Sequence, residues 1–99
     1  MHAHVNVWRL NEAGASGGDA VAREVAERLA AQPGVRSYTL IGTGEREVVA
    51  VTLFDSADEL EAAARAVAAL VEERVHPLAA GAAERRRGEV VFHRAAARP

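Results

Sequence analysis

The stretch at residues 48–60, VVAVTLFDSADEL, constrains the fold more than any other part of the chain. The residues before the acidic part alternate between an aliphatic set and a mixed set. The aliphatic set is Val49, Val51 and Leu53, and the mixed set is Val48, Ala50, Thr52 and Phe54. Successive side chains of a strand point to opposite faces. The pattern therefore predicts a central strand that is covered on both sides.

A helix is predicted to begin directly after this strand. Ser56 is followed three residues later by Glu59, which is the spacing of a capping box. In that arrangement the serine hydroxyl accepts from the glutamate amide, and the carboxylate reaches back towards the cap. We expect the helix to run from Ala57 to about Val75, because Pro77 cannot continue it.

The other elements follow from periodicity and from turn residues. Before the central strand we expect a first strand over His4–Leu10, followed by a polar loop over Asn11–Gly18. A helix should then run over about 18–31, capped by Ser16 or Asp19. A second strand over Val35–Gly42 and a hairpin loop over Thr43–Arg46 should lead into the central strand. After the second helix we expect an alanine-rich, then basic segment over Leu78–Gly88 and a last strand over Glu89–Arg94. The arginine run at 85–87 is expected to be a solvated loop, with the alternative that it holds a substrate carboxylate or phosphate.

This order of elements predicts a fold class. Strand, helix, strand, strand, helix, strand, with short loops and right-handed crossovers, favours one four-stranded antiparallel sheet with both helices on one face. That is the ferredoxin-like α+β sandwich, βαββαβ. The 99 residues make a single domain, 1–99.

Composition excludes several classes of function. The chain has no cysteine, so neither disulfides nor thiolate metal sites are possible. A net charge of −2 gives no general attraction to nucleic acid or to an anionic membrane. No apolar run is as long as a membrane span, and the first residues do not resemble a signal peptide. We therefore expect a cytoplasmic protein with neither nucleic acid nor membrane as a partner.

Two helices cover only one face of such a sheet, so the other face is open. We assign one set of alternating residues to the helices: Val5, Val7, Val49, Val51, Leu53, Val90 and Phe92. The other set then lies on the open face: His4, Asn6, Trp8, Thr52, Phe54, Val91 and His93. A partly apolar open face usually marks an interface or a ligand site. The sequence therefore predicts a homodimer, and it brings His4 close to His93 on neighbouring strands.

The size, the element order and the run VTLFDSADELEAAARAV resemble the dimeric α/β-barrel superfamily, and within it the antibiotic biosynthesis monooxygenase-like family. The resemblance implies two sheets paired face to face, with a cavity in each subunit. It also implies, as one possibility, a cofactor-independent monooxygenase that oxidises an aromatic small molecule. Some heme-degrading relatives use an asparagine on the first strand, comparable to Asn6, and a histidine on or after the second helix, for which His76 is the candidate.

On this interpretation the catalytic candidates are Asn6 and His93, and the ligand-binding candidates are His4, Trp8, Thr52 and Phe54. We expect neither a cofactor nor a metal, since two histidines without a third ligand make a poor metal site. The alternative is a non-catalytic ligand-binding or regulatory dimer, in which Trp8 fills the interface. A solvent-connected pocket lined by these residues would favour the enzyme, and a cavity filled by Trp8 and Phe54 would favour the alternative.

Overall fold

The computed structural model describes residues 1–97 and has the predicted α+β architecture. In chain order the main elements are β1 (His2–Arg9), α1 (Glu12–Ala30), β2 (Val35–Gly44), β3 (Glu47–Phe54), α2 (Ala57–Leu70) and β4 (Glu84–Glu89). After α2 the chain continues through a π-helical turn, η1 (Val71–Val75), and a short 3-10 turn, η2 (His76–Leu78). None of the helices in residues 1–97 is long and apolar enough to cross a membrane.

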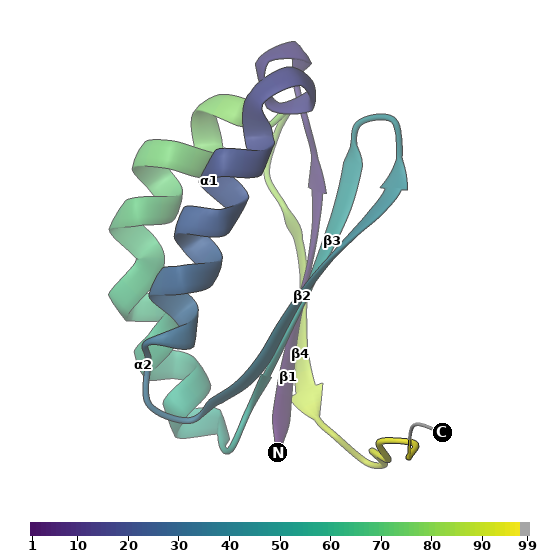
Figure 1. Cartoon of the computed structure of the whole chain (residues 1–99). Helices are drawn as coiled ribbons and strands as arrows, with labels where there is room; N and C mark the ends of the chain where they lie inside the picture. The colour runs from purple at the N-terminus through teal and green to yellow at the C-terminus, as the bar shows by residue number, and fades with distance from the viewer. Residues whose placement is uncertain (98–99) are drawn as a thin grey trace.

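The four strands form one antiparallel sheet in the order β2-β3-β1-β4, and both helices lie on the same side of it (Figure 1). The ferredoxin-like prediction is thus confirmed. The junction between β3 and α2 is also as predicted: the Ser56 hydroxyl accepts from the Glu59 amide at 3.3 Å and donates to the Glu59 carboxylate at 3.0 Å. Ser56 therefore both caps the helix and holds the carboxylate over its first turn.

The assignment of the two sheet faces is wrong. Phe54, Thr52 and Trp8 are 2%, 4% and 8% exposed and lie on the helix side, not on the open face. Phe54 belongs to the core cluster with residues of both helices: Val25, Leu29, Leu60, Ala63 and Val67. Both faces of β3 are apolar, and a period of two separates the faces without showing which one carries the helices.

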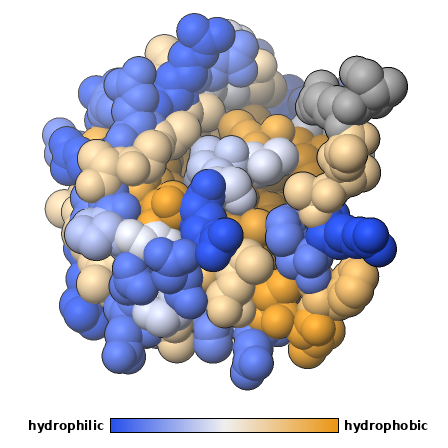
Figure 2. Space-filling view, turned by 60° about the horizontal axis from the view of Figure 1, so that its bottom comes forward, coloured by the Kyte–Doolittle hydropathy of each residue, from blue (hydrophilic) through white to orange (hydrophobic). Residues whose placement is uncertain are grey.

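The open face therefore carries the aliphatic set. Its centre is formed by half-buried side chains of the two middle strands: Val5, Val7, Val49, Val51 and Leu53. The register places Arg86 of β4 beside Val5, and Thr39 of β2 beside Val51. This face is thus apolar along the middle and charged at its β4 edge, whereas its β2 edge also carries Ile41, which pairs with Val49 and is 44% exposed. Figure 2 looks at the lower end of the molecule in Figure 1 and shows hydrophobic surface exposed among hydrophilic side chains.

Helix α1 begins earlier than predicted, because the segment 12–18 is helical rather than a loop. The cap is Asn11, whose side-chain oxygen accepts from the Gly14 amide at 2.9 Å. Its side-chain nitrogen donates to the Pro77 carbonyl at 2.8 Å, which fixes this end of α1 to η2. Gly14 is buried there, and a Cβ on it would clash with the Leu78 carbonyl oxygen. The glycine and serine residues of segment 12–18 are poor helix formers, so the sequence did not predict a helix there; tertiary packing stabilises it.

The last strand also differs from the prediction. β4 is formed by the arginine run and its neighbours, Glu84–Glu89, and the segment predicted as a strand follows it. Val90 makes one more bond, to the Met1 carbonyl at 2.8 Å. Val91 and Phe92 lie beyond the sheet and are 96% and 80% exposed. Charged side chains suit β4 because it is an edge strand, where they discourage pairing with other chains.

Candidate functional site

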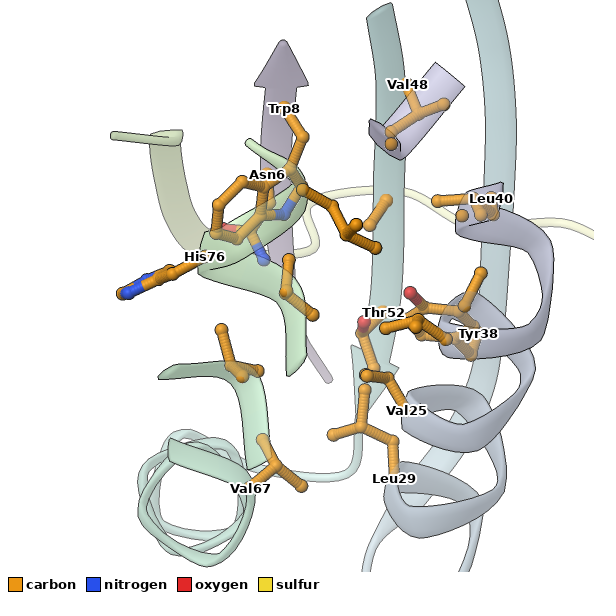
Figure 3. Close-up of a pocket in the computed structure, with 18 of the residues that line it drawn as sticks. Asn6, Trp8, Val25, Leu29, Tyr38, Leu40, Val48, Thr52, Val67 and His76 are labelled. Atoms are coloured by element: carbon orange, nitrogen blue, oxygen red, sulfur yellow. The ribbon is translucent and has the colours of Figure 1, made fainter. Parts of the chain in front are cut away.

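A pocket of about 520 Å³ lies between the sheet and the helices (Figure 3). Trp8, Val48, Thr52, Tyr38 and Leu40 line it from the strands. Val25 and Leu29 of α1 and Val67 of α2 line it from the opposite side. Ala50 and Thr52 are small residues in the middle of the sheet, which leaves room under the helices. The pocket is thus a mostly apolar space with few polar groups, as small-molecule sites generally are.

The register places the side chains of the pocket floor in two rows across the sheet. Directly paired residues lie on the same face of a sheet, with neighbouring strands about 4.8 Å apart. One row is Tyr38, Thr52, His4 and Arg87, and the other is Leu40, Ala50, Asn6 and Arg85. His4 and Asn6 therefore lie side by side on β1, each next to an arginine of β4.

His4 and Asn6 carry buried polar atoms that are left without a partner. Within the described residues, neither His4 Nε2 nor Asn6 Oδ1 has a hydrogen-bond partner. Both residues line the pocket. Buried polar atoms in native proteins are nearly always hydrogen-bonded, and an exception requires an explanation such as a ligand. The pair marks the place in the pocket where a bound molecule would be recognised.

The charge state of His4 depends on the same surroundings. Burial lowers the pKa of His4, and the nearby Arg87 and Arg85 cations lower it further, with Glu61 opposing them. The neutral imidazole is therefore favoured, and it can accept a proton. The pKa of Tyr38 at the other end of this row is raised by burial, so its phenol stays protonated. The sheet thus presents one proton acceptor and one proton donor to the pocket.

Trp8 forms the wall of the pocket near the turns after α2. Its ring lies 5.9 Å from the ring of His76, between centroids, with the planes inclined at 50°. His76 directly follows η1, and π-helical turns often occur at functional sites. His76 is exposed, so the contact lies at the edge of the pocket.

The structure brings five of the six predicted site residues to the pocket: Asn6, His4, Trp8, Thr52 and Phe54. They lie on the helix side of the sheet rather than on the predicted open face. His93 is not among the lining residues, because it lies in the exposed segment after β4. The predicted corner of His4 and His93 is therefore wrong. The pKa of His4 is lowered, and the main cause is burial rather than a second histidine.

Sequence reasoning did not assign Arg85 or Arg87 to the pocket. Their side chains alternate with that of Arg86 between the two faces of β4, but three arginines in a row show no such alternation in the sequence. His76 also lines the pocket, although the sequence placed it only loosely. Its ring packs against that of Trp8 at the edge of the pocket. Within residues 1–97, no three histidine or acidic side chains come together in a way that would hold a metal.

Comparison with known proteins identifies the fold. No protein-family model and no curated protein matches the chain. Among solved structures, a candidate antibiotic biosynthesis monooxygenase from Nitrosomonas europaea is similar with a TM-score of 0.81 and 10% identity, over 93% of this chain and 100% of that one. SnoaB, described as a cofactor-independent oxygenase from Streptomyces nogalater, is similar with a TM-score of 0.77 and 18% identity, over 93% and 94%. The chain therefore has the fold of the antibiotic biosynthesis monooxygenase-like proteins, as the sequence resemblance implied.

Proposed function

We propose that the chain is a cofactor-independent monooxygenase-like enzyme that acts on a polycyclic phenol or a related aromatic molecule in the pocket. The observation that carries the proposal is the pair of buried, unpartnered atoms, His4 Nε2 and Asn6 Oδ1, in a mostly apolar pocket of about 520 Å³. The likeness to SnoaB, a cofactor-independent oxygenase, supports it. The pocket is not filled by Trp8 and Phe54, which favours this proposal over the non-catalytic alternative.

Each side chain has a role that its position supports. Trp8 offers a flat surface for an aromatic ring, and offset stacking of two such rings is favourable. Asn6 Oδ1 can accept a hydrogen bond from a substrate hydroxyl, and the Asn6 Nδ2 group can donate to a substrate oxygen as negative charge develops on it. His4 accepts a proton, since its lowered pKa keeps it neutral near pH 7. These three groups lie on one strand, β1, and on one face of it.

The reaction needs molecular oxygen and no further reductant. His4 takes a proton from an activated methylene carbon of the substrate, and the anion gives one electron to O2. The resulting radicals combine to form a C–O bond, and His4 returns its proton to the peroxide. The O–O bond then breaks as the second hydrogen leaves that carbon, giving a carbonyl group and water. The balance is CH2 + O2 → C=O + H2O.

Oxygen consumption and isotope labelling test the proposal. The protein is incubated with anthrone and 1,8-dihydroxyanthrone under 18O2, with an oxygen electrode and mass spectrometry as readouts. We expect a rate above the uncatalysed oxidation and one 18O atom in the new carbonyl group. His4→Gln should lower the rate by about 10²- to 10⁴-fold, the usual contribution of a general base. His93→Gln is the matched control and should leave the rate unchanged. Tight binding without oxygen consumption would instead support the non-catalytic binding protein.

We further propose that the chain forms a homodimer through the open face of the sheet. The open face has an aliphatic centre formed by Val5, Val7, Val49, Val51 and Leu53, which the exposed Ile41 extends onto β2. An apolar centre of this kind is typical of the core of a protein interface. Two such sheets can pack face to face at about 10 Å. The pocket lies on the other side of the sheet, so each subunit would keep its own complete site.

A further inference from the structure

The two arginines that line the pocket differ from the one between them in the direction of their side chains. Arg85 pairs with Asn6 and Arg87 pairs with His4, so both lie on the helix side of the sheet. Arg86 pairs with Val5 on the open face, where it forms an ion pair with Glu84 at 2.8 Å. β4 therefore places two positive charges at the end of the pocket where His4 and Asn6 lie.

Only one of these two charges is neutralised within the protein. Arg87 donates to the carboxylate of Glu61 on α2 and forms an ion pair with it. Arg85 forms no ion pair with any residue of the described range 1–97. The acidic residues that line the pocket are Asp19 of α1, Glu45 of the turn after β2, and Glu72 of η1, and none of them is paired with Arg85. A positive charge without a partner thus borders the unpartnered atoms of His4 and Asn6.

The position of Arg85 also suits a ligand that enters from solvent. Its side chain borders both the main pocket and a shallower hollow formed by the segment between η2 and β4, with His76 on the edge of both. Arg85 is exposed overall, so a bound anion there would stay partly hydrated. Only the aromatic body of such a ligand would have to leave water, which avoids the cost of burying a charge.

We infer that the natural substrate is an aromatic carboxylate, with its ring system against Trp8 and its acid group held at the pocket mouth by Arg85. The guanidinium presents a planar fork of N–H donors that matches the two oxygens of a carboxylate. A lysine in this place would offer a point charge without that geometry. The inference rests on the proposed function for the identity of the site, and it adds the chemical class of the substrate.

A pair of ligands that differ only in charge tests the inference. Anthraquinone-2-carboxylate and its methyl ester are titrated into the full-length protein by calorimetry. We expect the acid to bind about 10- to 100-fold more tightly than the ester, the usual gain from a charge-assisted hydrogen bond. Arg85→Gln should bring the two affinities close together, and Arg85→Lys should keep only part of the difference. Arg86→Gln, on the opposite face of the same strand, should keep all of it.

The outcomes separate this inference from the proposed function. Preferential binding of the acid that depends on Arg85, without any oxygen consumption, would support the inference and contradict the enzyme. Oxidation of neutral anthrones by the wild-type protein, together with equal wild-type affinity for the acid and the ester, would support the enzyme and overturn the inference. Failure of the acid to bind at millimolar concentration also overturns it. Sedimentation velocity and circular dichroism on each variant show that neither the oligomeric state nor the fold has changed.

Discussion

The rings of Trp8 and His76 pack against each other with their centroids 5.9 Å apart, and this contact joins the end of β1 to the turn after α2. Trp8 is 8% exposed, whereas His76 is exposed. The indole therefore belongs to the core, and the imidazole covers it from outside. The pair forms one wall of the pocket, so a change to either residue should alter the site. The loss of stability should be larger for Trp8 than for His76.

The first prediction concerns the stability that this pair provides. Trp8→Ala should lower the free energy of unfolding by about 3–5 kcal/mol, as for other buried aromatic residues. His76→Ala should cost only about 0.5–1.5 kcal/mol, the value of an aromatic pair beyond its burial. Urea unfolding measures both, with His93→Ala as an exposed control that should change nothing. An equal cost for His76→Ala and Trp8→Ala would contradict this arrangement.

The second prediction concerns the start of α1. Gly14→Ala should lower the free energy of unfolding by about 1–3 kcal/mol, because its Cβ would overlap the Leu78 carbonyl oxygen and force the helix away from η2. Gly17→Ala in the same helix meets nothing within 4 Å, and it should raise the free energy of unfolding by about 0.5–1 kcal/mol. Thermal and urea unfolding of the two variants provide the comparison. A stabilising Gly14→Ala would mean that α1 and η2 are not in contact.

The third prediction is a pH dependence caused by His4. Its pKa in the folded protein lies below the ordinary value of about 6.5, so the unfolded chain binds more protons between those two values. The free energy of unfolding should therefore fall as the pH drops through 6.5 towards the lower folded pKa. His4→Gln should remove this part of the pH dependence, and His93→Gln should not. Identical urea midpoints at every pH from 5 to 8 for wild type and His4→Gln would contradict the burial of His4.

The fourth prediction concerns the open face. Sedimentation equilibrium at micromolar concentration should show a dimer. Val51→Lys should convert it to a folded monomer, because the charge would have to be buried without a partner at the centre of the interface. Ala62→Lys on the exposed side of α2 should remain dimeric. Wild-type protein that is monomeric throughout the concentration range would exclude the face-to-face pairing.

Much of the fold could be predicted because local signals agreed with the final packing. The alternation in residues 48–54 and the cap at Ser56 are local features, and both have the expected structure. The start of α1 could not be predicted in this way. Gly14, Gly17 and Gly18 are poor helix formers, and the helix there is stabilised by the contacts of Asn11 with η2, far along the chain.

The sequence placed three residues of the candidate site on one face of the first strand, but it assigned that face to the wrong side of the sheet. His4, Asn6 and Trp8 were grouped correctly because they alternate on one strand, and alternation is a local property. Which face the helices cover is decided by packing between distant elements, such as Phe54 against Val25 and Leu60. The register of β4 likewise depends on its pairing with β1, which is distant in the sequence. His93 was assigned to the site for this reason, and Arg85 was not.

The central claim is that ligands bind between the sheet and the helices rather than on the open face. Valine methyl resonances measure this directly, because Val48 lines the pocket whereas Val49 and Val51 of the same strand lie on the open face. The protein is titrated with anthraquinone-2-carboxylate or 1,8-dihydroxyanthraquinone, whichever binds more tightly. We predict large shifts for the methyl groups of Val48, Val25 and Val67, with those of Val49 and Val51 nearly unchanged. Shifts confined to Val5, Val7, Val49 and Val51 would contradict the claim and place the site on the open face.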